Sequence, residues 1–126
     1  MAKAAKPVIQ IKRAYEPPSR EDGYRVLIDR LWPRGIKKEA LHLDEWDKSL
    51  APSGDLRKWF DHRDERFEEF SKRYKKELES QQENLERLKK IAASKGLTLV
   101  YGARNTESNN AVVLREVLQK MRAASK

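Results

Sequence analysis

Residues 25–35 read RVLIDRLWPRG, and this stretch decides the fold because an apolar run gives way within a few positions to charged and aromatic side chains. Val26, Leu27 and Ile28 follow one another without a polar break, which predicts a strand buried on both faces, as in a parallel sheet. Pro33 cannot donate to a sheet ladder and Gly35 permits turn geometry. We therefore expect a loop at the carboxyl end of this strand, where open α/β sheets bind their ligands.

Other strands and helices are indicated on both sides of this stretch. Apolar residues around 8–11 predict a first strand, and residues 97–101, LTLVY, predict a second buried one. Pro52-Ser53 predicts a helix start, residues 64–95 predict either one kinked helix or two, and residues 111–121 predict a last helix. The order predicts an α/β fold, namely a small single domain of residues 1–126 with a mostly parallel sheet flanked by helices.

Composition limits the classes of protein to which the chain can belong. It has 126 residues, a net charge of +8 and no cysteine, so disulfides and thiolate chemistry are excluded. No apolar run reaches membrane-spanning length and residues 1–12 lack the apolar centre of a signal peptide, so we expect a cytoplasmic protein without a membrane partner. The sequence does not indicate an oligomeric state.

Most of the excess positive charge lies at the two ends of the chain. Residues 1–13 carry four basic residues and residues 117–126 carry three, with no acid in either segment, so 4 + 3 = 7 of the 8 excess charges are terminal. We expect residues 1–6 and 122–126 to be flexible basic ends. Nucleic acid bound through these termini is a weaker alternative partner, because the rest of the chain is close to neutral.

Parallel neighbouring strands would bring two loops and a helix start together. The residues that we expect to surround a ligand there are Asp29, Arg30, Trp32, Arg34, Ser53, Arg57, Tyr101, Arg104, Asn109 and Asn110. Planar guanidinium groups beside the free amides of a helix start suit a phosphate or carboxylate, with Trp32 as a stacking wall. The structural alternative is that Asp29 pairs with an arginine, Trp32 belongs to the core and Ser53 is only a helix cap.

Signals for specific chemistry are weak. Ser53 and His62 supply residue types of a hydrolase triad, but no GxSxG motif surrounds Ser53. His62 lies among Asp61, Asp64 and Glu65, which is more typical of a solvated helix start than of a metal site, so no metal site is predicted. No GxGxxG or Walker motif is present, and no cofactor is indicated.

Three motifs carry a family resemblance. DGYRVLIDRLWPRG at residues 22–35, APSGDLRKWF at 51–60, and LTLVYGAR followed by NNAVVL within 97–114 resemble the YeaO-like branch of the family "domain of unknown function 488". The resemblance covers nearly the whole chain, and the family has no assigned reaction. Other branches carry a cysteine and a Cys-His-Arg segment in the region that here reads LTLVYGARNTESNN. This chain has Tyr101 and Asn109-Asn110 there, so a thiol mechanism is excluded and catalysis is left undecided.

These observations predict a cytoplasmic α/β protein that binds a small anionic ligand, such as phosphate, a nucleotide or a phosphorylated metabolite, at the carboxyl ends of the strands. The first alternative is a nucleic-acid-associated protein that uses its basic termini. The second alternative is a protein-interaction module that uses the charged helices of residues 64–95.

Overall fold

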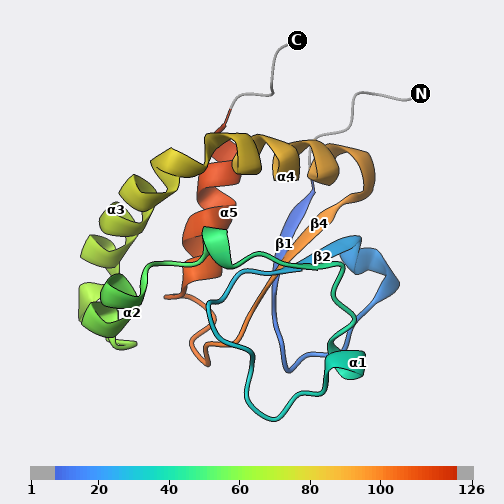
Figure 1. The fold of residues 1–126 in the computed structure, drawn as a ribbon, viewed down its shortest axis with the longest axis horizontal. Coiled ribbons are helices and arrows are strands. Elements are labelled where there is room, and N and C mark those ends of the chain that lie inside the picture. The colour runs from blue at the N-terminus through green and yellow to red at the C-terminus, as the bar shows by residue number, and fades with distance from the viewer. Residues whose placement is uncertain (1–7, 122–126) are drawn as a thin grey trace.

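A four-stranded sheet forms the centre of the computed structural model, which describes residues 8–121 (Figure 1). The strands are β1 (Ile9–Arg13), β2 (Tyr24–Leu27), β3 (Glu45–Trp46) and β4 (Leu97–Tyr101). Their spatial order is β1-β4-β2-β3 and every pairing is parallel. The predicted α/β fold is confirmed, including the parallel pairing of β2 with β4. The predicted flexible ends lie outside the described residues.

The period-two alternation of each strand divides its side chains between two cores. Val26 and Ile28 belong to the main core, whereas Leu27 belongs to a second cluster with Leu41 and Val100. Val26, Leu27 and Ile28 each have 0% of their surface exposed. The sequence therefore predicted correctly that this segment is buried on both faces.

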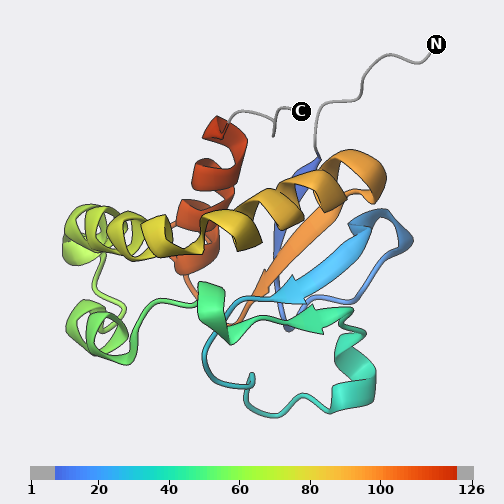
Figure 2. The same ribbon diagram turned by 45° about the horizontal axis from the view of Figure 1, so that its top comes forward.

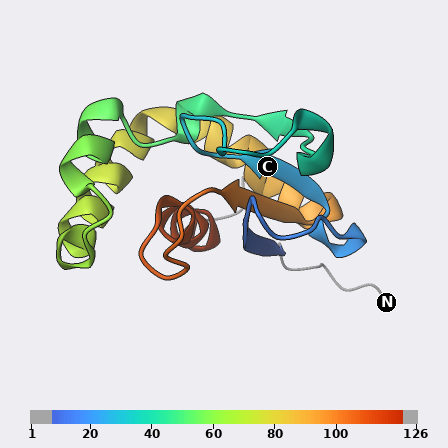
Figure 3. The same cartoon turned by 90° about the horizontal axis from the view of Figure 1, so that it is seen from below.

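Helices cover the sheet unevenly. Those on the main-core side are α2 (Gly54–Phe60), α3 (Phe67–Leu78), α4 (Gln82–Lys95) and α5 (Asn110–Lys120), and Figure 3 shows α2, α3 and α5 to one side of the strands. The short helix α1 (Lys38–Leu41) contributes Leu41 to the second cluster. Short 3₁₀ turns occupy Arg20–Asp22, Lys48–Leu50, Asp64–Arg66 and Glu79–Gln81.

Residues 64–95 form two helices rather than one. The 3₁₀ turn Glu79–Gln81 separates α3 from α4, and Figure 2 shows the change of direction between them. Gln81, the last residue of this turn, is a polar residue between the apolar residues of α3 and those of α4. Gly96, with a φ of 85°, then ends α4 and leads directly into β4.

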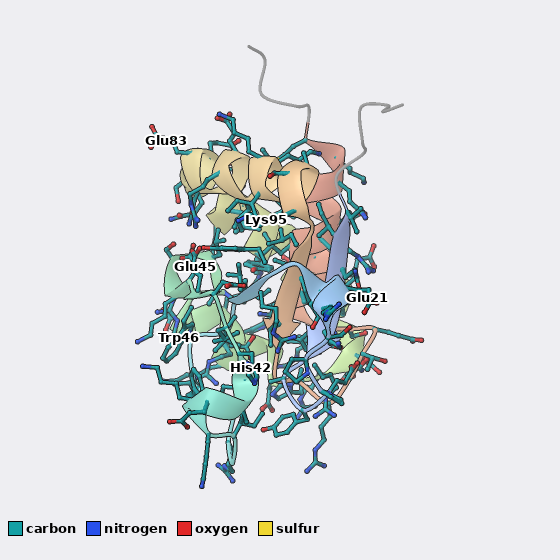
Figure 4. All side chains as sticks on the ribbon, turned by 90° about the vertical axis from the view of Figure 1, so that its right-hand side faces the viewer. Glu21, His42, Glu45, Trp46, Glu83 and Lys95 are labelled. Carbon is teal, nitrogen blue, oxygen red and sulfur yellow. The ribbon has the colours of Figure 1, made fainter. Side chains whose placement is uncertain are left out.

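Strand β3 was not predicted, because only two residues form it. It is held by side chains: the phenol of Tyr24 donates to Glu45 at 2.9 Å, and Arg87 of α4 pairs with the same carboxylate at 2.6 Å. Figure 4 shows Glu45 nearer to α4, and Trp46 and His42 nearer to α1. Tertiary contacts, rather than local propensity, therefore fix this edge of the sheet.

A buried ion pair anchors the start of β2. Asp22 accepts from Arg25 at 2.6 Å and from Lys12 at 3.0 Å, and the side chains of Asp22 and Arg25 are only 3% and 4% exposed. Burial acts to raise the pKa of Asp22, but hydrogen bonds from Lys12, the Ser19 amide and Arg25 outweigh it and lower the pKa.

Within the described residues, no helix has the length and apolar character needed to cross a membrane.

Candidate functional site

A pocket of about 350 Å³ opens beside the carboxyl ends of β2 and β4. The loop after β2, the region from Pro52 to His62 and the segment that leads into α5 together enclose it. The residues that line the pocket are Asp29, Arg30, Leu31, Trp32, Pro33, Arg34, Pro52, Arg57, Phe60, His62, Phe70, Gly102, Ala103, Ser108, Asn109 and Asn110. Seven of the ten predicted site residues are in this set, and Ser53, Tyr101 and Arg104 are not.

Asp29 joins the segments that form the pocket. One carboxylate oxygen accepts from the amide of Gly102 at 2.8 Å, and the other accepts from the side chain of Asn110 at 2.9 Å. Gly102 suits this close approach, because a Cβ atom there would lie 3.2 Å from Asp29 Oδ2. Burial raises the pKa of the Asp29 carboxyl, and the hydrogen bonds from Asn110 and Gly102 reduce that rise without cancelling it.

The structural alternative, in which Asp29 pairs with an arginine, does not hold within residues 8–121, where no arginine nitrogen lies within ion-pair distance of this carboxylate. The amide donors of Gly102 and Asn110 occupy its oxygens instead. Arg57 and His62 act on Asp29 only through weaker charge effects. The sequence could not predict these two donors, because both lie more than 70 positions from Asp29 along the chain.

Three arginines contribute to the pocket wall. Arg30, Arg34 and Arg57 are exposed, and none forms a salt bridge with a carboxylate of the described residues. Among residues 8–121, their only side-chain hydrogen bond runs from Arg30 Nε to the carbonyl oxygen of Pro52, at 3.3 Å. Three positive side chains with a single carboxylate, that of Asp29, in the same lining raise the positive potential of the pocket.

Trp32 has both of the roles proposed from the sequence. Its ring is half-buried against the second cluster, and its indole nitrogen donates to the carbonyl of Ile36 at 2.7 Å. Trp46 packs edge to face with it at a centroid distance of 5.3 Å. The remaining part of the ring lines the pocket, so Trp32 is a structural residue that also forms a wall of the site.

Ser53 is the N-cap of α2 and lies outside the pocket lining. Its hydroxyl accepts from the Leu56 amide at 3.1 Å and donates to Glu77 at 2.6 Å, while its own amide donates to the same carboxylate at 2.9 Å. Ser53 therefore has the role that the structural alternative gave it, that of a helix cap. Glu77 of α3 already supplies the negative charge that the positive end of a helix favours.

Tyr101 and Arg104 also lie away from the lining, for different reasons. Tyr101 shares the main core with Leu97 and Leu99 because the three alternate along β4, and only 2% of its surface is exposed. Burial raises the pKa of its hydroxyl, which makes ionisation at neutral pH less favourable. Arg104 is exposed on the loop after β4.

The two adjacent asparagines line the pocket but serve the fold. Asn109 caps α5, accepting from the Val112 amide at 3.0 Å and donating to the carbonyl of Asn105 at 2.8 Å. Asn110 donates to the carbonyl of Ile28 at 3.2 Å as well as to Asp29. Their amide nitrogens thus bind other parts of the chain, which holds the start of α5 against the end of β2.

Sequence reasoning missed the apolar part of the pocket. Pro33, Pro52, Phe60 and Phe70 all line it and are buried. The two phenylalanines stack with ring centroids 4.3 Å apart. Phe60 is a buried residue of α2, and no sequence signal distinguishes a core residue that borders a cavity from one that is fully packed.

His62 also lines the pocket, although the sequence offered it only as a weak triad or metal candidate. It follows the end of α2 in a left-handed conformation with a φ of 55°, and its ring lies 6.4 Å from that of Phe60. The acids around it are solvated, since Arg63 reaches Asp61 and Glu65 at 3.6 and 3.7 Å with all three side chains at least half exposed. Within residues 8–121, no group of three histidines or acids is arranged to hold a metal ion.

Comparisons with known proteins show the family to which this chain belongs. A family model described as "Inactive DUF488-N3 subclade" matches residues 8–126. The chain is 48% identical over 113 residues to "Uncharacterized protein YeaO" of Escherichia coli strain K12, covering 90% of this chain and 98% of that protein. It is 39% identical over 110 residues to "Uncharacterized protein Mb3100c" of Mycobacterium bovis, covering 87% and 92%. No solved structure matches it.

Proposed function

We propose that this protein, which belongs to the DUF488 family in its inactive N3 subclade, binds a small anionic ligand in the pocket beside β2 and β4. The observation that carries the proposal is the set of three pocket arginines without a carboxylate partner among the described residues. Grouped guanidiniums repel one another unless an acid or a bound anion compensates them. Asp29 lines the same pocket, but it forms no ion pair with these arginines, and one carboxylate can offset the charge of only one of the three.

Arginine suits this role because its planar fork can donate two parallel hydrogen bonds to a phosphate or carboxylate. A pocket of about 350 Å³ also falls within the range of roughly 300–1,000 Å³ that small-molecule sites occupy. Phosphate, a nucleotide or another phosphorylated metabolite would meet both conditions. The chain has no cysteine, so it cannot supply a thiolate nucleophile. Binding without catalysis is consistent with the word "Inactive" in the description of the subclade.

The two alternative functions have less support. Most of the residues of the basic termini lie outside the described residues. Several charged residues of α3 and α4 form ion pairs within the chain, such as Arg73 with Glu69 and Lys75 with Glu116. The rest of those helix faces is charged and exposed, as on most soluble helices.

A titration with phosphate and sulfate against chloride at equal ionic strength tests the proposal. Either oxyanion should raise the melting temperature of the wild-type protein beyond the effect of chloride. Arg57→Ala should remove this response, whereas Lys58→Ala, an exposed neighbour on the same helix outside the pocket lining, should keep it. Equal responses from the two variants, or no stabilisation beyond that by chloride, would count against an anion site.

A further inference from the structure

The pocket combines two regions of opposite character. Arg30, Arg34, Arg57 and His62 are exposed lining residues, and we call them the rim. The lining residues Pro33, Pro52, Phe60 and Phe70 are buried, and we call them the floor. A ligand with a single charged group would therefore place that group at the rim and direct the rest of its body inward.

An inorganic anion does not use most of this space. One water molecule occupies about 30 Å³ of the liquid, so the cavity of about 350 Å³ exceeds what a four-oxygen anion can fill. The floor must then remain hydrated or receive an apolar group. Removing water from apolar surface is favourable by roughly 25 cal/mol per Å², so an apolar group is the better occupant.

The inner polar groups argue against a hydroxyl-rich body such as a sugar. Asn109 uses both ends of its amide within the protein, and the carboxylate oxygens of Asp29 accept from Gly102 and Asn110. Buried hydroxyls of a ligand would lose their water without gaining full replacement, and each such loss is unfavourable. The side chains of the four floor residues form no hydrogen bonds either, so the buried part of the lining favours a body with few hydrogen-bonding groups.

We propose that the ligand is a flat aromatic ring carrying one phosphate or carboxylate group, with the ring inside the pocket and the anionic group at the arginine rim. The geometry of the walls favours a ring over an aliphatic chain. Trp32 and Phe60 offer aromatic surfaces, Pro33 and Pro52 offer rigid ones, and aromatic groups gain from such contacts beyond simple burial. This inference rests on the proposed function and narrows it to one ligand class.

Isothermal titration with phenyl phosphate, inorganic phosphate, ribose 5-phosphate and phenol tests the assignment. Phenyl phosphate should bind at least about tenfold more tightly than inorganic phosphate, because part of its ring surface becomes buried. Ribose 5-phosphate should gain nothing over inorganic phosphate. Phenol has the ring without the anionic group and should bind more weakly than phenyl phosphate.

A larger side chain in the pocket should reduce the space for the ring. Ala103 is half-buried and lines the pocket, so Ala103→Leu should remove the advantage of phenyl phosphate over inorganic phosphate. Ala93→Leu is the matched control, because Ala93 is exposed on α4 and lies outside the pocket lining.

Nuclear magnetic resonance on the wild-type protein gives a test that does not depend on how the variants fold. Phenyl phosphate, but not inorganic phosphate, should shift the amide signals of Gly102 and Ala103 through its ring current.

The outcomes distinguish this inference from the proposed function. Equal affinity for phenyl phosphate and inorganic phosphate, with both lost in Arg57→Ala, would overturn the aromatic ligand and keep the anion site. Tighter binding of ribose 5-phosphate than of phenyl phosphate would also overturn it. If no anion binds, or if binding does not depend on Arg57, the proposed function itself fails and the inference fails with it.

Discussion

Replacing Arg34 by alanine should leave the free protein stable and weaken its response to an anion. The Arg34 side chain is exposed and forms no ion pair or side-chain hydrogen bond with the described residues. Only its backbone carbonyl is engaged, accepting from the Tyr15 hydroxyl at 2.8 Å, and alanine keeps that group. The free energy of unfolding without ligand should therefore change by no more than about 0.5 kcal/mol.

The liganded protein should behave differently. A hydrogen bond to a charged group contributes about 1.5–3 kcal/mol, so loss of the Arg34 guanidinium should weaken anion binding roughly 10- to 150-fold. An anion at 100 times the wild-type Kd stabilises the folded state by about 2.7 kcal/mol. At the same concentration, a variant with a Kd about 10 to 150 times higher gains only about 0.3–1.4 kcal/mol.

Differential scanning fluorimetry can resolve this difference. At roughly 3–5 °C per kcal/mol for a chain of this length, the wild-type melting temperature should rise by about 8–13 °C and that of Arg34→Ala by about 1–7 °C. Lys37→Ala is a control of equal charge change, because Lys37 is exposed on the same loop and does not line the pocket. The reasoning is refuted if Arg34→Ala unfolds several degrees lower without ligand and responds to the anion like the wild-type protein.

Three further predictions concern the fold. Asp22→Asn leaves Arg25 buried without its carboxylate and should cost about 3–5 kcal/mol at pH 7 in urea unfolding. The folded state lowers the pKa of Asp22, so its ionised carboxylate stabilises the fold at any pH above the ordinary value of 3.8. This stabilisation disappears as the pH falls through the lowered pKa, so the wild-type and Asp22→Asn proteins should become equally stable in acid. Asp29 should show the opposite pH dependence, because its raised pKa means that ionisation in the folded state costs stability as the pH rises above 3.8. The stability of the wild-type protein relative to Asp29→Asn should therefore be greater at pH 4 than at pH 7. Gly23→Ala should cost at least about 2 kcal/mol in thermal unfolding, because φ is 64° and the added Cβ would lie 2.5 Å from the carbonyl oxygen of Lys95. Gly35→Ala, with a φ of 82° and open space around it, should cost less.

Local sequence patterns predicted part of the pocket lining, because the burial of strands and their parallel pairing follow from a few rules. The apolar runs at Val26–Ile28 and Leu97–Tyr101 predict buried strands, and buried strands in an α/β chain pair in parallel. Parallel strands place their following loops at one edge, so the loops that carry Arg34 and Asn110 were correctly expected to meet. Arg57 was correctly added through the helix that begins after Ser53.

Errors arose where a side chain had more than one candidate partner. Ser53 carries the same N-cap signal whether its hydroxyl is free or bound, and only the packing of α3 brings Glu77 to it. Tyr101 ends a strand that points into the site, yet its position in the alternation places it in the core. The sequence places several arginines near Asp29 as candidate partners, but in the folded chain Gly102 and Asn110 donate the hydrogen bonds to its carboxylate.

The sequence by itself determined the parallel α/β fold, the starts of α2 and α5 and the identity of the loops that meet at the strand ends. These features depend on periodicity, capping and turn residues, which act over a few positions and can be read without knowing the partners. Tertiary structure alone decided the strand β3, the partners of Asp29 and Ser53, and the division of the pocket into a charged rim and an apolar floor. Those features depend on contacts between segments tens of residues apart, and such contacts are selected by the packing of the whole chain rather than by any local pattern.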